Sequence, residues 1–219
     1  MCRIRVAALG FIALFAQAAS AADWPCFRGP NHDNVSTETG WQTDWKAHPP
    51  KLLWQAATGN KWGCPVVAGG RVFVHGDDYL GGRAGKETLF ALDAAAGKEL
   101  WKDESSVFAY NNQPITYSPT ADGDRVYFYT SSGTLKCLDA ATGNPVWVED
   151  LSKSLRAYRE VNYGYRCSPV IWQDCVIVTT RGGAPKDAPQ EPGPSLVAFD
   201  RMTGNLLWTN VQPSIDLKN

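Results

Sequence analysis

The residues best suited to recognition chemistry are arginines and tyrosines that alternate within one short stretch. An arginine guanidinium donates charged hydrogen bonds and a tyrosine ring offers a stacking surface, so the pair can bind a ligand or a partner. The alternative is that they decorate a long surface connection and bind nothing. The sequence therefore predicts a candidate ligand- or partner-binding segment that consists of Arg156, Tyr158, Arg159, Tyr163, Tyr165 and Arg166.

The histidines and cysteines do not form a pattern typical of a metal site or an active site. The three histidines lie far apart and no Cys-x-x-Cys is present, which argues against a zinc site. Cys137 takes the place of Ala91 and Ala198 in related segments, so we expect a small buried residue and not a reactive thiol. We predict no catalytic, cofactor-binding or metal-binding residue in this chain.

One stretch resembles a phosphate-binding loop without matching it. Residues 82–87 contain Gly-Lys, but the pattern requires glycine where Leu80 stands and serine or threonine where Glu87 stands. We therefore expect a solvated turn at residues 82–87.

Composition favours a turn-rich, aromatic β protein. The 219 residues include nine tryptophans, 20 glycines and 14 prolines. The 21 basic and 22 acidic residues give a net charge of −1, which offers no electrostatic basis for binding nucleic acid or an anionic membrane.

The first 21 residues have the pattern of a signal peptide. Arg3 and Arg5 precede an apolar run over residues 6–18, and Ala19-Ser20-Ala21 fits a small-x-small cleavage site. We expect cleavage before Ala22 and export to the periplasm or the outside, with no transmembrane span left; the alternative is an uncleaved anchor. Five cysteines would remain, an odd number whose pairing the sequence leaves open.

A repeated phrase indicates the elements that must carry the candidate segment. An aspartate, a glycine four residues later and a tryptophan four residues after that occur three times, after a strand-like alternation. The aspartate can cap a turn and the tryptophan can pack between units, so we predict structural roles for Asp93, Gly97, Trp101, Asp139, Gly143, Trp147, Asp200, Gly204 and Trp208.

Each phrase follows two further short strands, the first opened by proline. Four antiparallel strands per unit, with the aspartates 46 and 61 residues apart, are typical of propeller blades. We predict an all-β partial propeller that forms an open arc, within a domain over residues 62–219. It would contain about three complete blades, over residues 62–102, 116–149 and 165–210, and the start of a further strand. Residues 22–61 would form an N-terminal segment with a partial blade that ends in a strand at Trp54, and the chain would be a fragment of a closed ring.

The connections that vary in length between blades all lie at the same end of the blades. In an antiparallel meander, the links from strand two to three and from strand four to the next blade emerge together, and here they span residues 76–87, 103–115, 150–166 and 181–194. Long irregular loops commonly bind ligands, so this face is the functional candidate. The alternative is that the insertions are merely tolerated.

With its Pro-Val and Gly-x-Val-Tyr strands, the phrase A-x-D-x-x-T-G-x-x-x-W resembles the pyrroloquinoline-quinone-type (PQQ-like) β-propeller repeat, and Trp-Pro-x-Phe-Arg-Gly-Pro at residues 24–30 resembles an exported branch of that superfamily. The resemblance implies either a quinone-dependent dehydrogenase or a non-catalytic scaffold like that of the outer-membrane β-barrel assembly machinery. The dehydrogenases would require a disulfide between adjacent cysteines and a set of calcium ligands, and no two cysteines are adjacent here.

We therefore expect a non-enzymatic binding or scaffold role through the loops of one face. The partner would be a protein or polysaccharide, beside the missing blades of the same propeller. The alternative is part of a PQQ-dependent dehydrogenase, with PQQ and calcium held by residues outside this chain.

Overall fold

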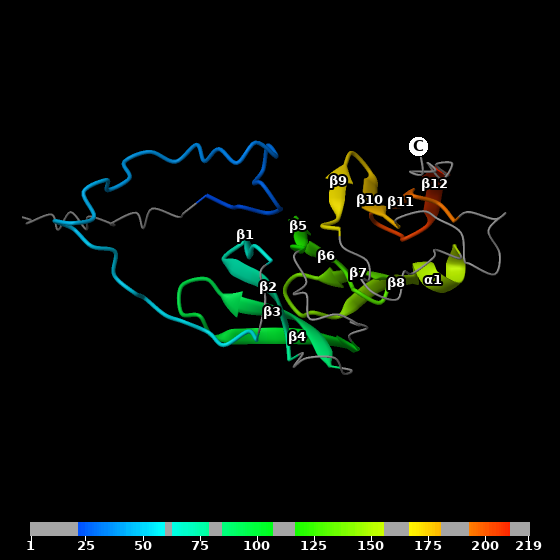
Figure 1. Ribbon diagram of the computed structural model, residues 1–219, viewed down its shortest axis with the longest axis horizontal. Coiled ribbons are helices and arrows are strands. Elements are labelled where there is room, and N and C mark those ends of the chain that lie inside the picture. The colour runs from blue at the N-terminus through cyan, green and yellow to red at the C-terminus, as the bar shows by residue number, and fades with distance from the viewer. Residues whose placement is uncertain are drawn as a thin grey trace, which may run out of the picture.

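The computed structural model describes residues 22–59, 63–78, 85–106, 117–155, 167–180 and 193–210, which form three four-stranded antiparallel sheets (Figure 1). The first sheet contains β1 (Val66–Ala68), β2 (Arg71–Asp77), β3 (Lys86–Asp93) and β4 (Glu99–Ser106). The second contains β5 (Thr120–Asp122), β6 (Arg125–Tyr129), β7 (Thr134–Asp139) and β8 (Pro145–Asp150). The third contains β9 (Val170–Trp172), β10 (Cys175–Thr179), β11 (Leu196–Asp200) and β12 (Leu206–Asn210).

Strand order within each sheet follows the chain, so each sheet is a simple meander. One helical turn, α1 (Leu151–Ser154), follows β8 and was not expected from the sequence. The prediction of an all-β fold built from four-stranded antiparallel units is confirmed, with α1 as a small addition.

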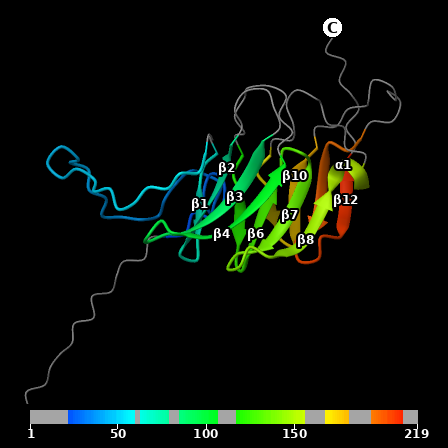
Figure 2. The same ribbon diagram turned by 90° about the horizontal axis from the view of Figure 1, so that it is seen from below.

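The second sheet is buried on both faces because it lies between the other two (Figure 2). Side chains alternate along a strand, and β6 sends Val126 and Phe128 into the core shared with the first sheet. Tyr127 and Tyr129, one residue on in each case, enter the core shared with the third sheet. The consecutive apolar residues of β6 therefore suit a strand whose sheet is covered on both faces. A strand that alternates apolar and polar residues would bury polar side chains there.

The sheets radiate from the side where their first strands lie (Figure 1). β1 contacts β5, and β5 contacts β9. We call this edge, formed by β1, β5 and β9, the inner edge.

An indole from each unit docks on the turn of the next. Trp101 of β4 donates its Nε1–H to the carbonyl of Ala140 (3.1 Å), and Trp147 of β8 donates to Arg201 (3.1 Å). Trp54, which precedes the first sheet, makes the same bond to Ala94 (3.0 Å). Residues 51–54 are not a strand in the structure, so the predicted strand at Trp54 was wrong, although its indole sits in the repeated position.

Each of these indoles covers the glycine of the turn it meets. At Gly143 the backbone is left-handed (φ 74°), and a Cβ would lie 2.6 Å from the Trp101 ring. The same arrangement places Trp54 on Gly97 and Trp147 on Gly204. A side chain at these positions would therefore collide with the docked ring as well as strain the backbone.

The repeated aspartates cap the turns. Asp139 Oδ1 accepts from the amides of Ala141 (3.0 Å) and Thr142 (2.8 Å) and from the Thr142 hydroxyl (2.8 Å). Asp200 Oδ1 accepts the equivalent bonds in the third sheet. Hydrogen bonds to the charged carboxylate, above all those from Thr142, lower the pKa of Asp139.

We therefore expect the pKa of the Asp139 carboxyl to lie below the usual range of an aspartate in a carbon-detected NMR titration. Because its pKa is lower in the folded chain than in the unfolded chain, its stabilising effect is present above the unfolded pKa and is lost as pH falls through the folded pKa. Thr142→Val removes the hydroxyl donor and should raise the pKa of Asp139 while leaving that of Asp200 low. An unchanged Asp139 pKa in Thr142→Val would contradict this assignment.

The two ends of the sheets differ. The links from first to second strand are two-residue turns at residues 69–70, 123–124 and 173–174, and the aspartate-capped turns lie at the same end. By the antiparallel order, the strand ends that flank the longer connections lie at the other end, which we call the long-connection end.

Candidate functional site

A segment near the N-terminus folds across the inner edge. The amide and carbonyl of Trp24 bond Val67 of β1 (2.8 and 2.9 Å), and the amide of Ala121 in β5 donates to Pro25 (2.8 Å). The chain then turns sharply. We call residues 24–32 the hook.

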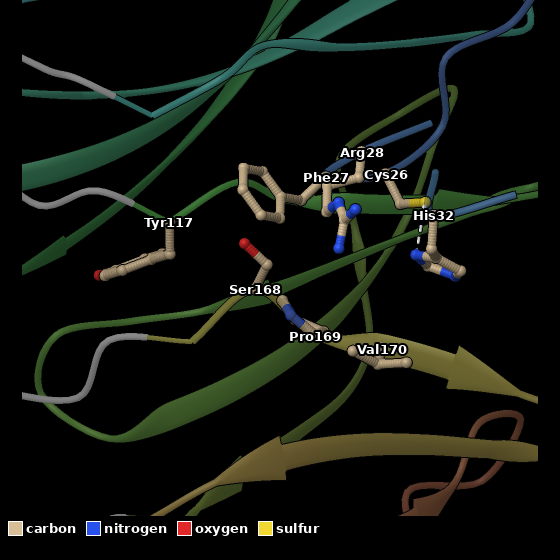
Figure 3. A pocket seen from close by; sticks show the side chains of 8 residues that line it. All are labelled: Cys26, Phe27, Arg28, His32, Tyr117, Ser168, Pro169 and Val170. Carbon is tan, nitrogen blue, oxygen red and sulfur yellow. Dashed lines mark hydrogen bonds between the residues drawn. The ribbon is translucent and has the colours of Figure 1, made fainter. Parts of the chain in front are cut away.

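The hook overhangs a half-open cavity of about 470 Å³ against the starts of the second and third sheets (Figure 3). A volume of this size suits a small molecule. Its walls are Cys26, Phe27, Arg28 and His32 of the hook, Tyr117 shortly before β5, and Ser168, Pro169 and Val170 at the start of β9.

Backbone bonds fix the shape of the hook. The amide of Gly29 donates to Cys26 (3.0 Å), and the amide of Asn34 donates to Arg28 (2.9 Å). The Cys26 thiol donates to the carbonyl of Gly29 (3.0 Å) and lies 3.7 Å from His32 Nδ1. Burial raises the pKa of the Cys26 thiol, so it remains a neutral donor that closes the turn.

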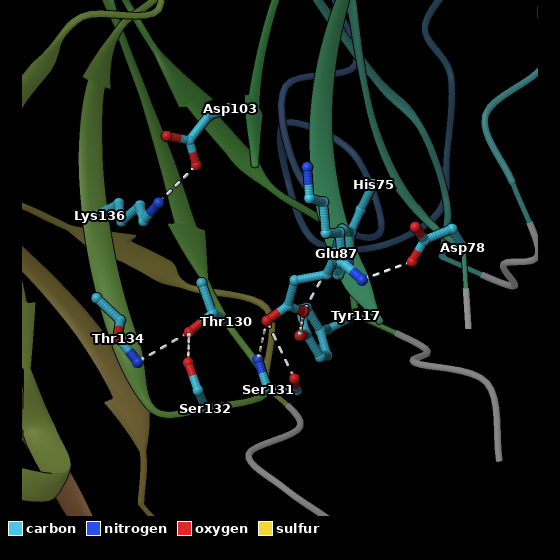
Figure 4. Close-up of polar contacts among 11 residues, drawn as sticks. His75, Asp78, Glu87, Asp103, Tyr117, Thr130, Ser131, Ser132, Thr134 and Lys136 are labelled. Carbon is cyan, nitrogen blue, oxygen red and sulfur yellow. Dashed lines mark hydrogen bonds and ion pairs between the residues drawn. The ribbon is translucent and has the colours of Figure 1, made fainter. Parts of the chain in front are cut away.

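A buried carboxylate lies beside the cavity at the long-connection end (Figure 4). Glu87 of β3 is fully buried, and its Oε1 accepts from the amide (2.9 Å) and hydroxyl (3.0 Å) of Ser131. Its Oε2 accepts from the Tyr117 hydroxyl (2.8 Å) and lies 3.3 Å from His75 Nε2. Four groups from three segments therefore satisfy one charge that would otherwise be costly to bury.

Tyr117 connects this network to the cavity. Its side chain lines the cavity wall, and its ring contacts that of His75 at a centroid distance of 5.0 Å. Burial and the neighbouring Glu87 carboxylate raise the pKa of the Tyr117 phenol well above its usual range. The phenol therefore stays protonated and acts as a fixed donor to Glu87.

The predicted solvated turn at residues 82–87 was wrong at its last two residues, because Lys86 and Glu87 begin β3; residues 82–84 lie outside the described residues. Glu87 is the second residue of β3 and points into the interior between the first and second sheets. Its equivalents six residues before the repeated aspartates are Gly133 and Pro194. Because an acidic residue occurs at this position in only one of the three repeats, the sequence did contain a signal that could have identified Glu87 as a site residue.

The predicted binding residues lie outside the described residues. All six fall within residues 156–166, so their arrangement stays a prediction. The residues that flank them, Leu155 and Cys167, both pack against the core between the second and third sheets. Cys167, the first described residue after this segment, directly precedes Ser168 of the cavity wall.

The structural residues of the repeat occupy two kinds of environment. Asp93, Asp139 and Asp200 hold their turns, and the tryptophans at 101 and 147 dock as described. Trp208 is 41% exposed, and its indole has no hydrogen-bond partner in the part of the chain that the structure describes. Cys137 is fully buried, as predicted.

Metal-binding clusters and membrane-spanning helices are both absent from the described ranges. No group of three or more His, Cys, Asp or Glu side chains within them is placed to hold a metal ion. None of the helices described is long and apolar enough to cross a membrane.

Comparison with known proteins gives matches of two kinds. A family model described as outer membrane protein assembly factor BamB matches residues 85–217. Quinohemoprotein alcohol dehydrogenase ADH IIB of Pseudomonas putida is 30% identical over 127 residues, which is 55% of this chain and 17% of that protein.

Solved structures share the architecture. The quinohemoprotein alcohol dehydrogenase from Comamonas testosteroni superposes with a TM-score of 0.61 at 20% identity, over 87% of this chain and 28% of its own. A europium-containing methanol dehydrogenase gives a TM-score of 0.52 at 18% identity, over 76% and 28%. At these identities the likeness shows the fold alone, and the chain spans less than a third of each relative's length.

Proposed function

The chain belongs to the PQQ-like β-propeller repeat superfamily, and from this premise we propose that it is an exported, non-enzymatic binding or scaffold protein. It would engage a protein or a polysaccharide through its long-connection end. The segment over residues 156–166 would supply the arginine and tyrosine contacts.

The difference between the two ends of the sheets supports this proposal. One end consists of short turns that repeat the same capping and docking contacts from sheet to sheet. The other end carries the features that occur once: the Glu87 network, the cavity and α1. Features that differ between repeats are free to serve recognition, because the repeated contacts already supply the packing.

The second candidate is part of a PQQ-dependent dehydrogenase, and the match to the Pseudomonas putida enzyme favours it. The residues described here do not fit a quinone and its calcium ion. Both Glu87 oxygens are already engaged by Ser131, Tyr117 and His75, and no two cysteines are adjacent in the sequence. Under this alternative, the residues that hold PQQ and calcium would lie outside this chain.

Photo-crosslinking from the two ends tests the binding role. A photoreactive phenylalanine analogue at Tyr163 should crosslink an envelope protein or polysaccharide in intact cells, whereas the same analogue at Lys98, in a turn at the other end, should not. Arg156→Ser combined with Arg159→Ser should abolish the crosslink from position 163. Equal crosslinking from positions 98 and 163 would contradict the proposal.

A dye-reduction assay tests the alternative. If the natural protein that contains this chain oxidises a primary alcohol, and the activity depends on added PQQ and calcium, the proposed binding role is wrong and the dehydrogenase alternative is supported. Export is tested separately, by fusing residues 1–21 to a phosphatase that folds only outside the cytoplasm; the fusion should be active.

A further inference from the structure

The exposed Arg28 side chain lines the cavity under the hook and has no partner among the residues that the structure describes. Within the described ranges, the Arg28 guanidinium makes no hydrogen bond or ion pair, while each of the other three arginines, Arg71, Arg125 and Arg201, donates to a carbonyl or a carboxylate. Figure 3 shows the Arg28 side chain projecting from the hook toward Ser168 and Pro169. A charged group that faces a cavity without a counter-ion is suited to an anionic ligand.

The backbone at Arg28 is held in a conformation that arginine rarely adopts. Its φ is 72°, in the left-handed region, and Gly29 follows at φ 81°. The bonds from Asn34 to Arg28 and from Gly29 to Cys26 keep it there. Strained residues of this kind concentrate at ligand clamps, where the conformation aims a side chain at its target.

The remaining walls offer one hydroxyl and several apolar surfaces. Ser168 Oγ accepts from the Ser118 amide (2.9 Å), so its own O–H is left to point elsewhere. Phe27 is 48% exposed, and Pro169 and Val170 form the facing wall. Among the described residues that line the cavity, none carries a carboxylate that would repel an anion.

We propose that this cavity binds a small organic carboxylate with an apolar ring. The Arg28 guanidinium, a planar fork that matches a carboxylate, would take the charge, and the Ser168 hydroxyl would donate a further bond. The ring would lie between Phe27 and the Pro169–Val170 wall. This site goes beyond the proposed function, because it would bind a small molecule whether or not the long connections bind a macromolecule.

Benzoate and its neutral isostere benzamide are suitable probes for the intact chain, with binding followed by NMR chemical-shift changes. We expect saturable binding of benzoate and at least about tenfold weaker binding of benzamide, because only benzoate pairs with the guanidinium. Arg28→Gly should weaken benzoate binding by about tenfold or more. The same change should raise the melting temperature by a few degrees, on the order of 2–4 °C, because glycine adopts the left-handed conformation without strain.

Two control variants separate the effect of the Arg28 charge from the effect of its backbone strain. Gln173→Gly relieves another left-handed residue (φ 52°), in the short turn between β9 and β10 and outside the cavity, and should leave benzoate affinity unchanged. Lys46→Ala removes an exposed cation from the same N-terminal segment and should also leave it unchanged. Absence of saturable benzoate binding, equal affinity for benzamide, or full affinity in Arg28→Gly would each overturn the proposal, and none of these results depends on the crosslinks from position 163.

Discussion

Replacing Trp101 with alanine is expected to lower the free energy of unfolding by about 3–5 kcal/mol, the usual cost of truncating a large buried aromatic residue. Trp101 is 9% exposed, packs in the core between the first and second sheets, and bonds the turn at Ala140. Its loss would leave a cavity over Gly143 and an unpaired carbonyl. Urea unfolding followed by circular dichroism measures the change.

Trp208→Ala is the matched control, because Trp208 holds the same repeat position on β12. It is 41% exposed and no turn in the described residues covers its ring. We therefore expect Trp208→Ala to cost less than about 1 kcal/mol, as for other surface substitutions. Equal losses for the two variants would mean that the docking contact contributes little.

Replacing Glu87 with alanine is expected to cost about 3–5 kcal/mol, since removing one member of a buried charged network leaves the others unsatisfied. The amide of Ser131, the hydroxyl of Tyr117 and His75 would all lose their common acceptor. Glu87→Gln keeps the shape and one acceptor oxygen, so it should cost less than Glu87→Ala. The same urea series reports both variants.

Glu104→Ala serves as the control on the neighbouring strand. Its carboxylate pairs with Lys86 (2.7 Å) and Lys102 (3.0 Å) on an exposed surface, where ion pairs stabilise little. We expect its unfolding midpoint to stay close to that of the parent chain. A loss as large as that of Glu87→Ala would show that burial of Glu87 is not the cause.

The sheets could be predicted because the sequence pattern that specifies their strands and turns is local and is repeated three times. Each aspartate-to-glycine turn joins strands that are neighbours in sequence, and three copies of the pattern reinforce one another. The superfamily and the all-β, partial-propeller fold followed from those copies, and both are confirmed.

The site was less predictable because it depends on contacts between distant segments. Glu87 is buried through Ser131, which lies 44 residues away, and Ala121 of the inner edge bonds Pro25 of the hook. Neither contact has a periodic signature. The sequence predicts only an N-terminal segment over residues 22–61, and the cavity that the hook forms with Ser168 could not be inferred without the placement of the hook.

The docking of each indole onto the turn of the next sheet is tested most directly by hydrogen exchange of the indole N–H groups, measured by NMR. Three of these groups, on Trp54, Trp101 and Trp147, donate to turn carbonyls, whereas that of Trp208 has no acceptor in the residues described. We predict slow exchange at the first three positions and fast exchange at Trp208. Equally fast exchange at all four would contradict the side-by-side stacking of the sheets through these turns.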